Sequence, residues 1–379
     1  MKHSPRVPVT RPLPTNEIAE FLSEHRASVL QALGGMSSFP MRPVGRLDDV
    51  TRQHEEHVQR RFEAEESNLF GLCIDPQHYL GRPGRERDEA LYGLFILGRS
   101  MSNLTLRKTF GDQWIDRALS EGLLWHQDLQ DIRSHFRLVP HGNLLFLAEH
   151  YCSESDMVYL SNDSLFMAQY LADKYGHSPE FSHVVDLGIG SGLLACSLAS
   201  KWGVSASGVD INSRAVAFAE ANGMINGIDG SFSVKSYDEA SIPEGSFVVA
   251  NPPFVFMPDA NGRAIHSDGG KMGMELTLQV MQLLNDKLPA NGVFAVMTQS
   301  VCLDATQGPH LLDAITGLCP RLDVEVENVG SMPILSKFEE FYVRQGVTGL
   351  NQLIITGRNG DGHVTYQAEN RFESEFCFG

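Results

Sequence analysis

Residues 183–192 read His-Val-Val-Asp-Leu-Gly-Ile-Gly-Ser-Gly. The first five residues form an apolar run that predicts a buried strand, and a helix is expected directly afterwards, over residues 193–201. Glycines at the alternate positions 188, 190 and 192 let the backbone turn sharply and approach a ligand closely, because no Cβ atoms stand in the way. The stretch therefore predicts a strand–loop–helix unit with a ligand site at the loop.

Strands and helices alternate outward from this stretch through the C-terminal part of the chain. Further strands are expected over residues 206–211, 247–250, 293–298, 323–329 and 350–356, and further helices over residues 165–174, 214–224 and 275–287. The alternation is typical of an α/β fold with a doubly wound, mostly parallel sheet. In such sheets ligands bind beyond the carboxyl ends of the strands.

A second motif, Gly208-Val209-Asp210-Ile211-Asn212, ends the next strand about twenty residues after the glycine loop. The Asp210 carboxylate can accept hydrogen bonds from both hydroxyls of a ribose, and Ile211 can pack on the face of an adenine. A glycine loop followed by an acidic strand end predicts a nucleoside ligand.

The third motif, Asn251-Pro252-Pro253-Phe254, follows the strand over residues 247–250. Two consecutive prolines fix the backbone and remove two amide donors, so nearby carbonyls stay available as acceptors. Asn251 Oδ1 and the Pro252 carbonyl can accept the two hydrogens of a planar amino group, while Phe254 stacks on its plane. We therefore expect Asn251, Pro252 and Phe254 to be catalytic residues that align a planar nitrogen with an electrophile.

These three motifs, in this order, resemble the class I S-adenosylmethionine (SAM) dependent methyltransferases. The resemblance covers roughly residues 155–357, and within the class it is to the small-methyltransferase group that includes release-factor glutamine and rRNA N-methyltransferases. It implies a Rossmann-like methyltransferase domain and an enzyme that methylates nitrogen, with SAM as the cofactor and S-adenosylhomocysteine as its product.

The resemblance also implies roles for individual residues in holding SAM. Gly188, Gly190 and Gly192 would line the methionine part, Asp186 would support its amino group, and Asp210 would hold the ribose. The remaining cofactor contacts expected are those of Asp163, Ile211, Tyr237, Asp238 and Asn251. For Asp163, capping of the helix over residues 165–174 is an equally good interpretation.

Residues 1–150 and 151–379 are expected to form two domains. Helices predicted over residues 16–33, 90–98, 102–110 and 112–123 precede a hairpin whose strands are expected over residues 136–140 and 143–147. Helices followed by a two-stranded wing resemble a winged-helix domain. Its near-neutral charge favours a substrate lid or recognition domain over a DNA-binding one.

Charge and cysteine usage narrow the possible partners. The 379 residues hold 30 Lys and Arg against 47 Asp and Glu, and 12 of the basic and 27 of the acidic residues lie in 151–379. Nucleic acid is therefore a disfavoured partner.

The six cysteines form no Cys-x-x-Cys pair, so no metal site is expected. The absence of a long apolar run predicts that the chain has no membrane span and that the protein is cytoplasmic.

The sequence leaves three hypotheses for the function: two enzymes that differ in their methyl acceptor, and one protein that is not an enzyme. The first is a small-molecule metabolite with an amide, guanidinium or amine nitrogen, for which Asp259, Asp268 and Glu275 would provide an acidic loop. The second is an RNA base or a protein glutamine, and RNA would need a basic channel across Arg133 and Arg137. The third is a non-enzymatic winged-helix regulator that senses SAM. Such a regulator would not need the motif at Asn251, whose acceptors bind an amino group.

Overall fold

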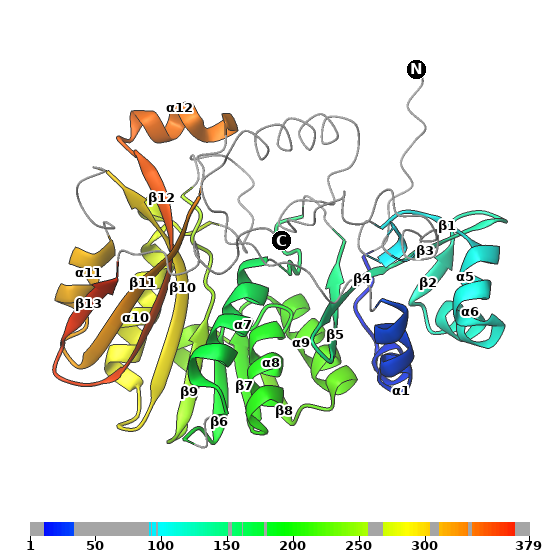
Figure 1. Ribbon diagram of the computed structural model, residues 1–379, viewed down its shortest axis with the longest axis horizontal. Helices are drawn as coiled ribbons and strands as arrows, with labels where there is room; N and C mark the ends of the chain where they lie inside the picture. The colour runs from blue at the N-terminus through cyan, green and yellow to red at the C-terminus, as the bar shows by residue number, and fades with distance from the viewer. Residues whose placement is uncertain are drawn as a thin grey trace.

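The computed structural model describes residues 11–33, 91, 93–95, 98–150, 154–160, 162–177, 180–256, 268–303, 311–332 and 336–367. A twisted sheet with helices on both faces makes up the larger part, and the N-terminal helices and short strands lie at one end of it (Figure 1). Within the described part of the chain, no helix is both long enough and apolar enough to cross a bilayer.

Eight strands form the main sheet, in the order β13-β11-β12-β10-β9-β6-β7-β8. Their bounds are β6 His183–Leu187, β7 Ser205–Asp210, β8 Gly230–Val234, β9 Ser246–Ala250, β10 Val293–Cys302, β11 Leu322–Met332, β12 Gly349–Asn359 and β13 Val364–Gln367. All neighbours run parallel except β12, which is antiparallel to both β10 and β11. The predicted doubly wound, mostly parallel α/β sheet is confirmed.

Strand β6 is the point where the chain changes its direction of travel across the sheet. It pairs with β7 on one side and with β9 on the other. In a doubly wound sheet the crevice at such a point, beyond the carboxyl ends of the strands, is the usual ligand site. The glycine loop leaves β6 at this edge, and Asn251 leaves β9 there.

Helices cover both faces of the sheet because its central strands are apolar on both sides. Val184 and Phe247 pack in the same hydrophobic cluster as α7 (Asn162–Tyr175), α8 (Leu193–Trp202) and α9 (Ser213–Asn226). Val185 and Val248 point the other way, into the cluster with α10 (Glu275–Lys287) and α11 (Leu311–Leu318). The described residues of this part also include the 3-10 helices η3 (Tyr237–Glu239) and η4 (Lys271–Gly273) and the helix α12 (Ser336–Arg344).

The described residues of the N-terminal part include three complete helices and a small antiparallel sheet. The helices are α1 (Asn16–Ala32), α5 (Asn103–Phe110) and α6 (Asp112–Ser120), and the sheet has the order β1-β3-β2, with bounds Met101–Ser102, Asp131–Ser134 and Leu124–His126. Of the helix expected over residues 90–98, the residues described as helical are 91 and 93–95. The resemblance to a winged-helix domain stays a prediction.

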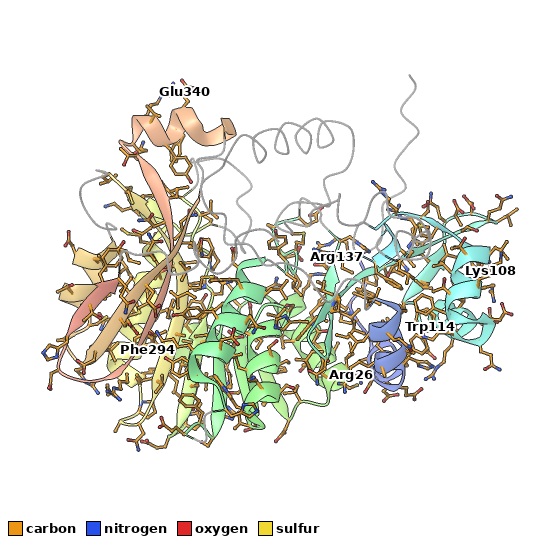
Figure 2. The ribbon with its side chains drawn as sticks, viewed as in Figure 1. Arg26, Lys108, Trp114, Arg137, Phe294 and Glu340 are labelled. Atoms are coloured by element: carbon orange, nitrogen blue, oxygen red, sulfur yellow. The ribbon has the colours of Figure 1, made fainter. Side chains whose placement is uncertain are left out.

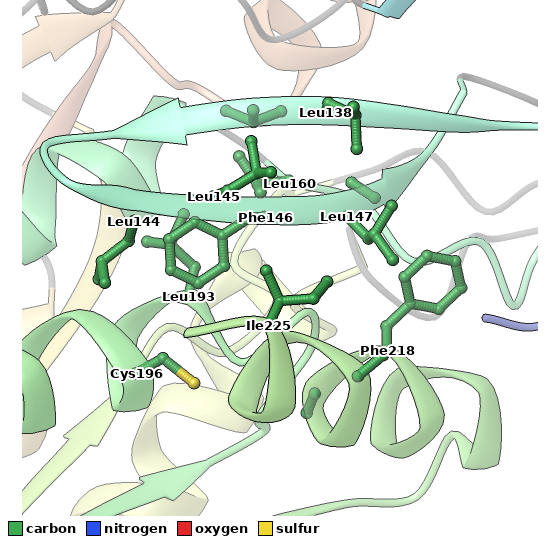
Figure 3. Close-up of a cluster of buried hydrophobic side chains, with 14 of the residues drawn as sticks. Leu138, Leu144, Leu145, Phe146, Leu147, Leu160, Leu193, Cys196, Phe218 and Ile225 are labelled. Atoms are coloured by element: carbon green, nitrogen blue, oxygen red, sulfur yellow. The ribbon is translucent and has the colours of Figure 1, made fainter. Parts of the chain in front are cut away.

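The predicted hairpin is present as β4 (Phe136–His141) and β5 (Leu144–Glu149), but it is not a solvated wing. Its side chains are buried against α8 and α9 of the main sheet, where Phe146, Leu147, Phe218 and Ile225 form one cluster (Figure 3). The physical reason lies in the sequence of β5, whose six residues are all buried and do not alternate between apolar and polar.

Two asparagines of α9 hold the hairpin through its backbone. Asn222 exchanges two hydrogen bonds with Leu147, of 2.7 and 2.9 Å, and Asn226 exchanges two with Leu145, of 2.9 and 2.8 Å. Their side chains thus act as a neighbouring strand would. The hairpin is joined to the sheet domain, and the division of the chain at residue 150 remains a proposal.

Candidate active site

A pocket of about 780 Å³ opens at the carboxyl ends of β6, β7 and β9, a volume that suits a ligand of nucleoside size. The predicted site residues that line it are Asp186, Gly188, Gly190, Asp210, Ile211, Tyr237, Asp238 and Asn251. Four other predicted residues, Asp163, Gly192, Pro252 and Phe254, are not among its lining residues. The structure therefore brings together residues as far apart in the sequence as Asp186 and Asn251, which are separated by 65 positions.

Asp186 presents a buried carboxylate oxygen to this pocket. Its Oδ2 accepts a hydrogen bond from the Ala195 amide at 3.3 Å, while Oδ1 is buried without a partner among the described residues. Burial raises the pKa of Asp186 well above its ordinary value. A cationic group beside this oxygen would favour the ionised carboxylate and offset its loss of hydration.

Asp210 is fixed by the backbone on both sides. Its Oδ2 accepts the Gly190 amide at 3.0 Å and its Oδ1 accepts the Asn212 amide at 2.8 Å. Gly190 has a φ of 52°, a left-handed conformation that glycine adopts without a Cβ penalty. Each carboxylate oxygen keeps one lone-pair direction free, so both can accept the hydroxyls of a ribose.

Ile211, Tyr237 and Asp238 extend the pocket beyond Asp210. Ile211 is 64% exposed, which is unusual for a large apolar side chain and leaves its surface available to a flat ring. The Tyr237 hydroxyl lies close enough to the glycine loop that a Cβ on Gly188 would sit 3.2 Å from it. Asp238 accepts a hydrogen bond from the Ser236 hydroxyl.

These residues fit SAM. The partnerless Asp186 oxygen matches a methionine ammonium group, Asp210 matches a ribose, and Ile211 matches an adenine face. Asp186, Asp210, Ile211, Gly188 and Gly190 would hold the cofactor.

Two residues that were predicted to contact the cofactor, Gly192 and Asp163, do not line the pocket. Gly192 precedes α8, and a Cβ there would meet Ala219 of α9 at 3.1 Å, so it permits close packing of the two helices. Asp163 lies within the first turn of α7, which begins at Asn162, so it is not the residue that caps that helix. Burial raises the pKa of Asp163 to about 6.

Asn251 presents a carbonyl oxygen at the edge of the pocket. Its Nδ2 donates a hydrogen bond of 2.9 Å to Ser164 Oγ, and its Oδ1 is buried without a partner in the described structure. Both Asn251 and Ser164 line the pocket. The bond to Ser164 orients the amide so that an acceptor, not a donor, faces an incoming nitrogen.

The loop after Asn251 is packed against a glycine turn. Pro253, rather than Pro252, lines the pocket, and Phe254 is buried. A Cβ on Gly269 would lie 2.6 Å from the Phe254 Cα, and one on Gly273 would lie 2.5 Å from the Phe254 carbonyl oxygen. The turn over residues 269–273 therefore supports the backbone of the Asn-Pro-Pro-Phe motif from behind.

The acidic loop expected to recognise a cation has a structural role in its described part. Asp268 Oδ1 accepts the Gly270 amide at 3.1 Å, and Glu275 Oε2 accepts the Lys271 amide at 3.3 Å. Both carboxylates thus cap the glycine turn. Asp259 lies outside the described residues.

The arginines considered for an RNA channel are engaged inside the molecule. Arg137 of β4 is 1% exposed (Figure 2). Arg133 donates two hydrogen bonds to the Gly98 carbonyl, at 3.1 and 2.5 Å. Neither offers a free guanidinium to a phosphate backbone.

The sequence did not identify several pocket residues. Ser164 lies one residue beyond the predicted Asp163, and α10 contributes Leu276, Gln279, Leu283 and Asp286. No local signal marks these positions, since the face of a helix that meets a pocket depends on tertiary packing. Over the described ranges, no group of three His, Cys, Asp or Glu side chains could hold a metal ion.

Residues 160–267 match the family model of the methyltransferase small domain. A Methanocaldococcus jannaschii protein with the provisional name protein N5-glutamine methyltransferase is 28% identical over 147 residues, which cover 37% of this chain and 71% of that protein. The range that matches the family model, residues 160–267, contains all three motifs of the sequence analysis.

Solved structures with a similar arrangement share little sequence with this chain. M. jannaschii TYW2 in complex with AdoMet is 12% identical, with a TM-score of 0.40 over 60% of this chain and 86% of that one. Pyrococcus abyssi Trm5b is 13% identical, with a TM-score of 0.41 over 61% of this chain and 59% of that one.

The expectation of a small-molecule acceptor is wrong, because the curated relative is named for a glutamine in a protein. Two of the acidic side chains on which the expectation rested, Asp268 and Glu275, cap a turn. The expectations of a methyltransferase and of SAM as its cofactor are confirmed by the family match. Residues 160–267 therefore match the methyltransferase small-domain family, and the chain is a SAM-dependent methyltransferase.

Proposed function

We propose that this enzyme methylates the side-chain carboxamide nitrogen of a glutamine in a protein. The observation that carries the proposal is the buried Asn251 Oδ1, which has no partner in the described structure and lines the cofactor pocket. A primary carboxamide supplies the N–H donor that this oxygen needs. The name of the M. jannaschii relative supports the same acceptor.

The chain's residues contribute alignment and charge stabilisation. Bound SAM supplies a methyl group activated by its sulfonium. Asn251 Oδ1 would accept one N–H of the carboxamide, so that the nitrogen is held toward the methyl group. Methyl transfer would form a carbon–nitrogen bond and release S-adenosylhomocysteine, one N–H proton would pass to water, and Asn251 Oδ1 would stabilise the positive charge that develops on nitrogen.

An RNA acceptor is less well supported by the described residues. The sequence carries 12 basic against 27 acidic residues beyond position 150. Arg137 is buried and Arg133 is bound to a backbone carbonyl. A protein substrate needs no continuous basic surface on the enzyme, so the charge distribution favours a protein acceptor over RNA.

The test is to incubate the purified enzyme with methyl-labelled SAM and a cell extract, then to separate protein, RNA and small molecules. We expect the label in protein, and we expect Asn251→Ala to abolish it while S-adenosylhomocysteine still binds. Asn291→Ala, at an exposed position of a loop, is the matched control and should label normally. Label in RNA, or unchanged labelling by Asn251→Ala, would overturn the proposal.

A further inference from the structure

One wall of the cofactor pocket has no regular secondary structure. Met157, Val158 and Tyr159 line the pocket from a segment between β5 and α7 that is neither helix nor strand. The position of such a segment depends on its tethers to the rest of the molecule. We call residues 156–159 the pocket wall.

The tethers of the pocket wall converge on one ion-pair network. Val158 donates its amide to Glu149 Oε2 at 2.7 Å, and the Asp156 carbonyl accepts the Asn212 side-chain amide at 2.8 Å. The Asp156 carboxylate lies 2.7 Å from Arg11 Nη1 and 3.9 Å from Arg214 Nε. Both ends of the wall are thus fixed by charged or polar side chains.

Arg11 is the centre of this network. Its Nε and Nη2 bind both carboxylate oxygens of Glu149, at 3.1 and 2.9 Å, while its Nη1 binds Asp156. The side chain of Glu149 is 7% exposed and that of Arg214, which also binds Glu149 at 2.5 Å, is 15% exposed. A bidentate contact to a carboxylate shielded from water is stronger than a surface ion pair.

The network connects four segments of the chain, and its two arginines are far in sequence from its two carboxylates. Arg11 belongs to the arm before α1, Glu149 ends β5, Asp156 begins the pocket wall, and Arg214 lies in the first turn of α9. Arg214 also binds the backbone carbonyls of Arg11 and Pro12, each at 3.3 Å, so the arm itself is held beside the pocket.

We propose that Arg11 is a positioning residue for SAM: by bridging Glu149 and Asp156 it fixes the pocket wall, so that the N-terminal arm controls cofactor affinity. Because coupling is reciprocal, a bound cofactor stabilises the docked arm by the same free energy. The inference concerns the cofactor side of the pocket and does not depend on which acceptor is methylated.

The test is calorimetric binding of S-adenosylhomocysteine to the full chain. We expect Arg11→Ala to raise the Kd about tenfold and Arg11→Lys, which keeps the charge but not the fork, to recover part of the loss. Arg26→Ala is the matched control, because Arg26 also joins the N-terminal part to α9, through the Ile225 carbonyl at 3.1 Å, but at the end of α9 away from the pocket. Its Kd should stay within about twofold of the parent value.

A double variant separates positioning from a general loss of stability. If Arg11 acts through Asp156, then Arg11→Ala with Asp156→Ala should weaken binding by less than the sum of the single effects. An unchanged Kd for Arg11→Ala, or equal losses for Arg11→Ala and Arg26→Ala, would overturn the proposal. Neither result would bear on the glutamine acceptor, which is tested by the position of the methyl label.

A measurement on the unaltered protein covers the case in which Arg11→Ala does not fold. S-adenosylhomocysteine should slow hydrogen exchange in a peptide that spans residues 11–20 as well as in one that spans the pocket wall. Slowed exchange in the pocket wall alone would show that the arm is not coupled to the cofactor, and would contradict the proposal.

Discussion

At the scale of single residues, the orientation of one side-chain amide decides what the pocket can accept. Asn251 points a carbonyl oxygen toward the acceptor because Ser164 takes its amino group at 2.9 Å. Without that bond the amide could turn by 180° and present N–H donors, which repel the hydrogens of a carboxamide.

We expect Ser164→Ala to lower kcat for methyl transfer by about a hundredfold, because the acceptor nitrogen loses its alignment. The Kd for S-adenosylhomocysteine should change little. Ser164→Thr, which keeps the hydroxyl, serves as the control and should retain most of the activity. Parallel losses in kcat and cofactor affinity would show that Ser164 supports the pocket generally and not the Asn251 amide.

The buried carboxyl group of Asp186 lowers the free energy of unfolding of the ligand-free protein at neutral pH. Its pKa is raised by burial, so the folded protein binds this proton more tightly than the unfolded chain does. The free energy of unfolding therefore falls as pH rises from the unfolded pKa to the folded one, and the loss is complete above the folded pKa.

Asp186→Asn should accordingly raise the Tm of the ligand-free protein by a few degrees at neutral pH while weakening S-adenosylhomocysteine binding at least about tenfold. Thermal unfolding and calorimetry measure the two effects. Asp229→Asn, at an exposed position, should change neither quantity. A lower Tm for Asp186→Asn would mean that the carboxylate stabilises the empty pocket, contrary to this account.

At the scale of elements, the sequence predicts long, regular segments well and short or exposed ones poorly. Helix α10 has the bounds predicted for it, and β6 does too. Strand β8 was missed because Gly230-Ser-Phe-Ser-Val is an edge strand with weak apolar alternation. The helix expected over residues 112–123 ends at Ser120, because the chain turns at Gly122, which has a φ of 81°.

The hairpin β4-β5 shows why packing cannot be derived from local pattern alone. Its strands were predicted, but its partner, α9, lies about seventy residues further along the chain. The two asparagines that attach it lie one helical turn apart on the face of α9 that meets β5. Only the folded structure shows that Asn222 and Asn226 share this role.

Asn226→Ala should lower the free energy of unfolding by about 3 kcal/mol, because the Leu145 amide and carbonyl are left buried without partners. Urea denaturation measures the change. Asn291→Ala, at an exposed position, should have almost no effect. A loss of less than about 1 kcal/mol would show that the hairpin is held by its apolar contacts alone.

A separate prediction concerns the glycine turn over residues 269–273, which packs behind the Asn-Pro-Pro-Phe loop. Gly273→Ala should reduce methyl transfer at least about tenfold, because its Cβ would push on the Phe254 carbonyl and shift Asn251. Gly203→Ala is the control: its φ of 69° matches the 72° of Gly273, but no atom lies within 4 Å of the added carbon. Equal effects of the two variants on activity would attribute the loss to backbone strain and not to the contact.

At the scale of the whole molecule, the fold and the cofactor site follow from three short motifs. The order of strand, glycine loop, acidic strand end and Asn-Pro-Pro-Phe predicts the sheet and places eight of the twelve predicted residues around one pocket. The acceptor did not follow, because Asp268 and Glu275, two of the acidic residues used to infer it, cap a turn. The coupling of the arm at Arg11 to the pocket joins residues more than 130 positions apart and has no sequence signal.

The central claim is that the methyl group reaches a glutamine carboxamide. The most direct measurement is peptide mass spectrometry of protein labelled by the enzyme, with fragmentation to locate the added methyl group. We expect it on the side-chain nitrogen of glutamine, and we expect no modified peptide with Asn251→Ala. A methyl group on arginine, lysine or a carboxylate, or label recovered in nucleosides, would contradict the claim.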